Sequence, residues 1–124
     1  EPGGSVPRDP LEFSRLVDRW SSLGLPLVVE LTLPSSDASD PLARSVIAPM
    51  PHVLPDGWSA AAQQAWVERN VPVLLAKPAV HALLWNQCAD SDPHDYPHAG
   101  LIDAAGRAKP ALNTLARLRR EHLQ

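Results

Sequence analysis

The sequence predicts an α/β fold in which three helices alternate with two short strands. Two continuous apolar runs, 27–33 and 79–85, have the length and the Val/Leu content of buried strands. Each run lies between segments whose apolar residues recur at helical spacing. The order helix, strand, helix, strand, helix is typical of a parallel sheet, because parallel strands need a helical crossover between them.

The first helix leads directly into the first strand. It is predicted to begin at Asp9 or Pro10 and to end at Gly24, because proline suits a first helical turn and glycine suits a helix end. The strand over 27–33 is bounded by prolines, and its continuous apolar character predicts that both of its faces are covered. The apolar residues at helical spacing in the first helix are Leu11, Leu16, Val17, Trp20 and Leu23.

A long loop and a second helix separate the two strands. Residues 34–58 are rich in Pro, Ser and Asp, which is typical of a loop, and a loop of this length is more often functional than idle. Ser59 suits the N-cap of a helix that runs towards Ala76. Pro72 lies inside this helix and is expected to kink or break it, because proline lacks a backbone donor.

The second strand is followed by another polar loop and by the last helix. The loop "NQCADSDPHDYPHAG" begins directly after the strand over 79–85. Pro110 is expected to occupy the first turn of the last helix. The residues of this helix that are predicted to point inward are Leu112, Leu115 and Leu118.

One carboxylate, Glu30, lies inside the first apolar run. Burying an unpaired carboxylate is costly, so a glutamate in such a run is paired, on a surface, or functional. Strand alternation places Glu30 on one face with Val28 and Thr32, and leaves an apolar opposite face that packs on helices. Because sites in parallel sheets lie at the carboxyl ends of strands, where both long loops begin, we expect Glu30 to face a polar site there.

Composition limits the partners of the chain. Its 124 residues make one domain or a piece of a larger one, and the formal net charge of -3 provides no basic field for nucleic acid. No apolar run approaches the roughly 18 residues of a membrane span, so no membrane is expected as partner. Residues 1–10 are polar and Pro/Gly-rich, which predicts an N-terminal loop and not a signal peptide. The single cysteine, Cys88, excludes an internal disulfide.

Three sequence segments occur in a recognisable order: "LVDRWSSLGLPLVVELTLPS", "QQAWVERNVPVLLAKPAVHALLW" and "AGLIDAAGRAKPALNTL". Over roughly residues 11–120 they resemble the C-terminal part of glycoside hydrolase family 10, the endo-β-1,4-xylanases. In that family a "G-x-P-(I/L)" turn leads into a seventh strand with a "T-E-L-D"-like motif, followed by a "Q-A" helix, an eighth strand with "W-G-x-x-D", and a "K-P-A" helix. Glu30, Thr32 and Pro34 match the "T-E-x-T-x-P" motif of a divergent branch.

The resemblance implies that residues 11–124 form the last two strands and flanking helices of a (β/α)8 barrel. Since a full barrel takes about 250 residues, this part is incomplete without an N-terminal portion. The implied activity is retaining cleavage of internal β-1,4 linkages in xylan or a related plant polysaccharide, with Glu30 as nucleophile. The acid/base glutamate of the family follows an asparagine at the end of the fourth strand, outside this chain. The resemblance implies no cofactor and suggests an extracellular or periplasmic location.

The resemblance also implies a set of substrate-binding residues, and the sequence departs from the family at two positions. Thr32 replaces the aspartate that follows the nucleophile by two. Asp90 matches the family aspartate without a gap if Asn86 stands at the usual tryptophan, whereas a one-residue insertion places Trp85 there as the floor under a sugar ring. A core position is the alternative for Trp85. Two aromatic residues of the loops are assigned to the border of the cleft, with loop anchoring as the alternative: Trp58 and Tyr96.

The loop "DSDPHDYPH", residues 90–98, contains three aspartates and two histidines and therefore raises the question of a metal site. Its spacing fits neither a calcium loop with a central glycine nor a helical histidine pair. The sequence accordingly predicts a solvated, Pro-stiffened loop and no metal.

Three classes of function stay open from the sequence. The first is a retaining endo-β-glycanase that is active when joined to its N-terminal half. The second is a non-catalytic or degenerate carbohydrate-binding piece of a barrel, which Thr32 and the shifted Trp85 favour. The third is an unrelated α/β interaction domain.

Overall fold

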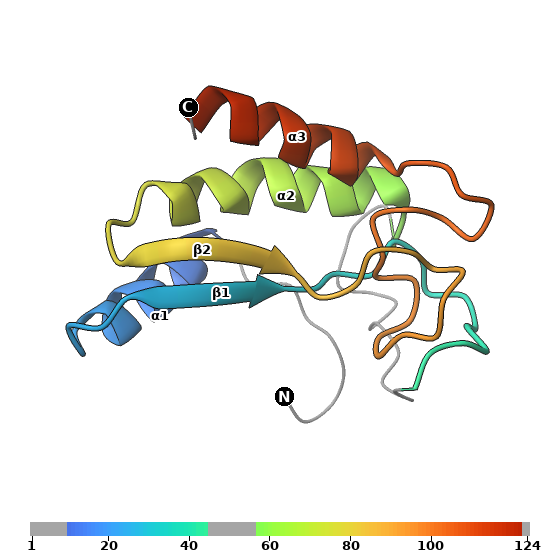
Figure 1. Cartoon of the computed structure of the whole chain (residues 1–124), viewed down its shortest axis with the longest axis horizontal. Coiled ribbons are helices and arrows are strands. Elements are labelled where there is room, and N and C mark those ends of the chain that lie inside the picture. Colours follow the sequence, from blue (N-terminus) through green and yellow to red (C-terminus); the bar gives the residue numbers. More distant parts are fainter. Residues whose placement is uncertain (1–9, 45–56, 123–124) are drawn as a thin grey trace.

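The computed structural model describes residues 10–44 and 57–122, which form three helices and a two-stranded parallel sheet (Figure 1). Along the chain they are α1 (Pro10–Ser21), β1 (Leu27–Leu31), α2 (Ala60–Leu75), β2 (Val80–Trp85) and α3 (Pro110–His122). The predicted α/β element order is thereby confirmed, and the barrel of which it would be part stays a prediction. No helix within the described residues is long and apolar enough to cross a bilayer.

The boundaries of the elements agree with the prolines and glycines of the sequence. The N-terminal loop predicted over 1–10 lies outside the described residues except for Pro10, which begins α1. Gly24 has a φ of 72°, a left-handed conformation that suits glycine, and it follows the end of α1. Pro110 is the first residue of α3, as predicted.

The helices lie together on one side of the sheet. Figure 1 shows α2 running along the two strands, with α3 beside it on the side away from the strands, and α3 and α2 are in contact. α2 also contacts α1. The core therefore lies between the sheet and α2, with α1 and α3 completing it.

The two faces of β1 differ as strand alternation predicts. Leu31 and the following Leu33 are buried in the core and Val29 packs against it, whereas Val28 on the opposite face is 65% exposed. The prediction that both faces are covered is wrong for the described residues, because the helices cover only one of them. Glu30 lies on the open face.

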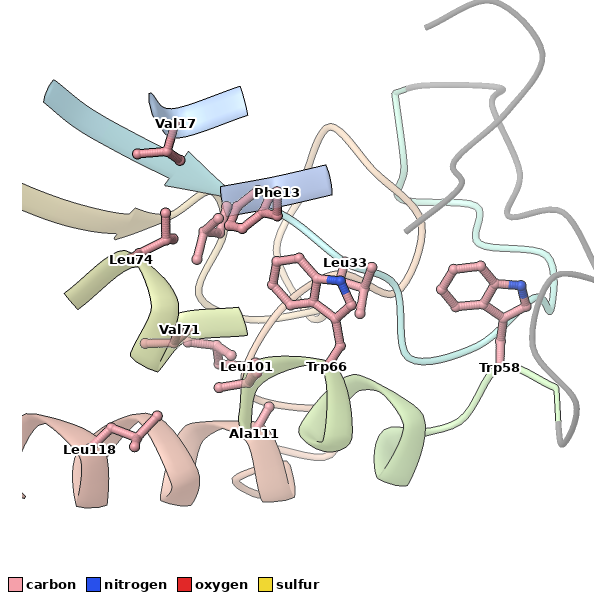
Figure 2. Packing of buried hydrophobic residues seen from close by; sticks show 12 residues of the cluster. Phe13, Val17, Leu33, Trp58, Trp66, Val71, Leu74, Leu101, Ala111 and Leu118 are labelled. Carbon is pink, nitrogen blue, oxygen red and sulfur yellow. The ribbon is translucent and has the colours of Figure 1, made fainter. Parts of the chain in front are cut away.

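α2 supplies more buried side chains than either of the other helices. Trp66 on this helix meets Phe13 of α1 edge to face, with ring centroids 5.7 Å apart (Figure 2). Gln63, which is fully buried, donates from Nε2 to the Leu33 carbonyl at 2.8 Å and so fixes α2 to the chain beyond β1. In α3, Leu118 is buried, while Leu112 and Leu115 are partly buried against the core.

Pro72 does not end α2. The helix begins at its predicted N-cap, where Ser59 Oγ accepts from the Ala62 amide at 3.0 Å, and continues to Leu75. The expectation of a break is wrong because tertiary packing outweighs one missing hydrogen bond. Both Val71 and Leu74, on either side of the proline, are 2% exposed or less.

Candidate functional site

The carboxyl ends of β1 and β2 bring Glu30 next to Asn86. The strands pair in parallel with Glu30 opposite Leu84 and Leu31 opposite Trp85, and the Asn86 amide donates to the Leu31 carbonyl at 2.8 Å. The side chain of Asn86 donates from Nδ2 to Glu30 Oε1 at 2.5 Å. Two adjacent parallel strands thus hold a carboxylate and an amide in contact at one edge of the sheet.

The position of Glu30 at the exposed face of the sheet explains why a charged residue occurs in an apolar strand. Glu30 is exposed on the open face of the sheet, so its carboxylate is not desolvated by the apolar residues beside it in sequence. The amide of Asn86 fixes one carboxylate oxygen. Among the described residues, no hydrogen bond engages the other carboxylate oxygen, Oε2.

A polar hollow of about 260 Å³ begins at Asn86. Its wall is formed by the two loops that follow the strands and includes Arg44, Gln87 and Asp95. The side chain of Gln87 donates to the Tyr96 carbonyl at 3.1 Å, and Tyr96 itself is 39% exposed. Both hydrogen-bond donors and hydrogen-bond acceptors line the hollow, and such a lining suits an uncharged polar ligand such as a sugar.

The tryptophans assigned to sugar binding lie elsewhere. Trp85 shares the helix-facing side of the sheet with Leu31, opposite the face of Glu30, and donates its indole N–H to the Ala99 carbonyl at 2.7 Å. Trp58 is 8% exposed and belongs to the hydrophobic core (Figure 2). The structure therefore brings neither indole to the face that carries Glu30.

Asp90 is a buried member of an ion pair. Its Oδ2 is 2.7 Å from Lys109 Nζ, and its Oδ1 accepts from the Gly100 amide at 2.9 Å. Lys109 also donates to Ser35 Oγ at 2.9 Å. The two side chains of the ion pair are only 6–7% exposed. Both Asp90 oxygens are engaged within the protein, and their described contacts hold the two long loops together.

A second buried pair, His94 and Asp40, was not predicted from the sequence. The imidazole Nε2 is 2.6 Å from Asp40 Oδ2, and the side chains are 2% and 6% exposed. The burial of His94 and Asp90 shows that the loop over 90–98, predicted to be solvated, is solvated only in part. No sequence signal marks the pair, because its members are 54 residues apart in two loops of similar composition.

The pKa values of His94 and Asp40 are shifted in opposite directions. Burial alone would lower the pKa of His94, but hydrogen bonds to Asp40 and to the Asp92 carbonyl, with the charges of Asp40 and Asp90, raise it above 6.5. Burial alone would raise the pKa of Asp40, but hydrogen bonds from the His98 amide, the His94 ring and the Leu42 amide hold it below 3.8. Both shifts favour the charged pair.

The loop over 90–98 raised the question of a metal site. Within residues 10–44 and 57–122, no three His, Cys, Asp or Glu side chains are grouped so that they hold an ion. Four ionisable side chains of that loop have partners outside it: His94 and His98 contact Asp40, Asp90 pairs with Lys109, and Asp95 pairs with Arg44.

Comparison with known proteins yielded no match, either among protein-family models or among curated proteins. Of the six predicted site residues, Glu30 and Asn86 are joined to each other by a hydrogen bond. The backbone carbonyl of Tyr96 accepts from Gln87, which lines the same hollow as Asn86. The functional assignment therefore rests on this contact and on the sequence motifs that surround it.

Proposed function

We propose that this chain supplies the nucleophile-bearing C-terminal part of a retaining β-glycan hydrolase. The observation that carries the proposal is the contact between Glu30 and Asn86 at the carboxyl ends of two adjacent parallel strands. Catalytic groups of (β/α)8 enzymes come from the ends of several strands at this same edge. The resemblance to family 10 glycoside hydrolases implies the same residue, Glu30, as nucleophile.

In the proposed reaction, Glu30 attacks the anomeric carbon and forms a covalent glycosyl-enzyme, which water then hydrolyses. Asn86 holds Oε1, so Oε2 is the attacking oxygen. The leaving oxygen takes its proton from a second carboxyl group about 5 to 5.5 Å from the first. We assign that acid/base glutamate to an N-terminal barrel portion that would also cover the open face of the sheet.

We propose xylan or a related β-1,4-linked plant polysaccharide as substrate. The polar hollow beside Asn86 offers amide and carboxylate groups of the kind that hydrogen-bond sugar hydroxyls. Of the proposed binding residues, Asn86 lines the hollow, and Tyr96 is hydrogen-bonded to the lining residue Gln87. For Trp58, Trp85 and Asp90 we propose a supporting role, because direct sugar contacts would require breaking the internal contacts described above.

Substitution of Glu30 in the chain joined to its N-terminal barrel portion tests the proposal. Glu30→Gln should lower turnover of xylan by a factor on the order of 10⁴ while binding of xylo-oligosaccharides persists, because the amide keeps the shape but cannot act as nucleophile. Glu68→Gln, at an exposed site on α2, is the matched control and should leave turnover unchanged. Unchanged turnover in Glu30→Gln would exclude Glu30 as nucleophile.

A second function, carbohydrate binding without catalysis, is favoured by Thr32. This residue stands where family 10 proteins carry an aspartate, and its buried hydroxyl has no hydrogen-bond partner in the described structure. It cannot supply the charge that an aspartate contributes beside the nucleophile. The same experiment separates the two functions, since a non-catalytic protein would bind xylo-oligosaccharides but hydrolyse none before any substitution.

A further inference from the structure

The imidazole of His94 is held between two oxygen acceptors. Its Nε2 is 2.6 Å from the carboxylate of Asp40, and its Nδ1 is 2.6 Å from the carbonyl oxygen of Asp92. The side chain is 2% exposed, so water has little access to either nitrogen. Both nitrogens therefore have to satisfy oxygen atoms that cannot donate a hydrogen bond when Asp40 is ionised.

With Asp40 ionised, only the protonated ring satisfies both oxygens. A neutral imidazole carries one N–H and one lone pair, so one nitrogen would direct its lone pair at an oxygen 2.6 Å away. The imidazolium donates to both acceptors and neutralises the buried Asp40 carboxylate. Because hydrogen bonds from the protein hold the pKa of Asp40 low and keep its carboxylate ionised, the geometry assigns a proton to each nitrogen.

Segments 40–44 and 92–98, which we call the clasp, are joined around this ring. The Arg44 amide donates to the His94 carbonyl at 2.8 Å, and the His94 amide donates to the Leu42 carbonyl at 3.2 Å. Asp40 additionally accepts from the His98 amide at 2.9 Å. One segment follows β1 and the other follows β2, so the clasp ties together the two loops above the sheet.

We infer that the proton on His94 closes the clasp and that its loss opens the clasp, which makes the wall of the hollow beside Asn86 sensitive to pH. Both Arg44 and His94 line that hollow. Opening would therefore remove part of its wall. The inference rests on the geometry of the clasp and holds whether or not Glu30 is a nucleophile.

Other charged groups near the ring do not replace this proton. Asp90 adds negative charge but is neutralised by Lys109 at 2.7 Å. His98 lies 3.8 Å from Asp40 through Nδ1 and reaches the Ala38 carbonyl through Nε2 at 3.0 Å.

The remaining charges of the clasp lie at the surface. Arg44 and Asp95 form an exposed pair at 3.6 Å, and Asp92 contributes its backbone carbonyl to the ring. Asp40 is therefore the negative partner on which the proton depends.

The direction of the pH dependence follows from the two shifts. The folded protein raises the pKa of His94 above its unfolded value of 6.5. The stability that the His94 proton gives to the clasp is therefore complete below pH 6.5 and is lost as the pH rises through the folded pKa. The folded protein lowers the pKa of Asp40 below its unfolded value of 3.8. The stability contributed by the Asp40 carboxylate is therefore present above pH 3.8 and is lost as the pH falls through the folded pKa. The clasp is closed between these limits and opens on the alkaline side by loss of the His94 proton.

Nitrogen NMR of the full 124-residue chain tests the protonation state directly. At pH 6 both ring nitrogens of His94 should show the shifts of an imidazolium, and hydrogen exchange should find the Arg44 amide protected. As His94 deprotonates, the protection of Arg44 should fall by up to tenfold per pH unit, beyond the intrinsic change in exchange rate. A neutral ring at pH 6 with Arg44 still protected would overturn the inference.

Two glutamine variants separate the clasp from general effects of pH. In His94→Gln the protection of Arg44 should be weak and independent of pH, while the Leu27 amide, which donates to the carbonyl of Ala79 directly before β2, stays protected. In His81→Gln, at an exposed position of β2, the pH dependence at Arg44 should persist. A pH dependence that survives His94→Gln with its amplitude unchanged would contradict the role of this proton.

Discussion

Lys109 illustrates how single residues hold the site loops in place. Its ammonium group contacts Asp90 at 2.7 Å, Ser35 at 2.9 Å and the His98 carbonyl at 3.1 Å. These three partners come from both loops that follow the strands. A charge so nearly buried is tolerated because each of its donors has an oxygen acceptor.

Removing this cation should be far more costly than removing an exposed one. Lys109→Met leaves the Asp90 carboxylate buried without its charged partner, and we expect a loss of about 3–5 kcal/mol in the free energy of unfolding, measured by urea denaturation. Lys77→Met is the control, because Lys77 pairs with an Asp18 whose side chain is 60% exposed. That pair should contribute about 1 kcal/mol or less. Equal effects of the two substitutions would contradict a structural role for the Lys109 pair.

At the scale of elements, α2 organises the fold. It contacts both other helices, and through Leu33 it fixes the chain that leaves β1. Its stability comes from buried side chains and from the Ser59 cap, which together tolerate a proline in its last turn.

Replacing that proline should stabilise the helix. Pro72→Ala restores the backbone donor and removes the clash of the ring with the preceding turn, which should raise the free energy of unfolding by about 3 kcal/mol. The greater freedom of the unfolded chain offsets roughly 0.4–1 kcal/mol of this gain. We expect a net gain of about 2 kcal/mol, seen as a higher melting temperature. Pro110→Ala at the first turn of α3, where no donor is needed, serves as the comparison and should give no such gain. A lower melting temperature for Pro72→Ala would show that the proline ring is required for packing.

At the scale of the whole molecule, the described part leaves large apolar side chains open to solvent. Val28 on β1 and Leu84 on β2 are 65% and 51% exposed on the face that carries Glu30. Trp20 of α1 is 56% exposed, and Leu25 in the turn before β1 is 62% exposed. Exposed apolar surface and free strand edges favour association unless another chain segment covers them.

This surface predicts that the 124-residue chain self-associates. Light scattering during size-exclusion chromatography should show a molecular mass that rises with protein concentration. Val28→Ser with Leu84→Ser should reduce that rise, since the substitutions replace exposed apolar groups on the open face by hydroxyls. Leu42→Ser, at a loop position with 41% exposure, should leave it unchanged. A strictly monomeric chain at all concentrations would contradict the prediction.

The sequence predicted the elements better than it predicted the site. Pro10, Ser59 and Pro110 mark local preferences of the backbone, so helix starts could be read from them. The register between the strands could not be predicted, because it shifts between Leu27 and Val28 and thereby decides that Asn86, and not Trp85, meets Glu30.

Polar pairs between residues far apart in the chain could likewise not be predicted from the sequence. Ionisable residues occur throughout both loops, and local propensity does not say which of them become buried together. Asp40 pairs with His94 across 54 residues because the two strands bring their loops side by side. Asp90 was assigned to substrate from a motif, whereas the structure engages both of its oxygens within the protein.

The central claim is that Glu30 becomes covalently bonded to a sugar, and a trapping experiment tests it most directly. The chain joined to its N-terminal barrel portion would be incubated with a 2-deoxy-2-fluoro xylobioside carrying a good leaving group, digested, and analysed by mass spectrometry. We expect one added glycosyl group, on Glu30, because a retaining enzyme forms a covalent intermediate that the fluorine slows. A label on another carboxylate, or turnover of xylan with no label on Glu30, would contradict the account.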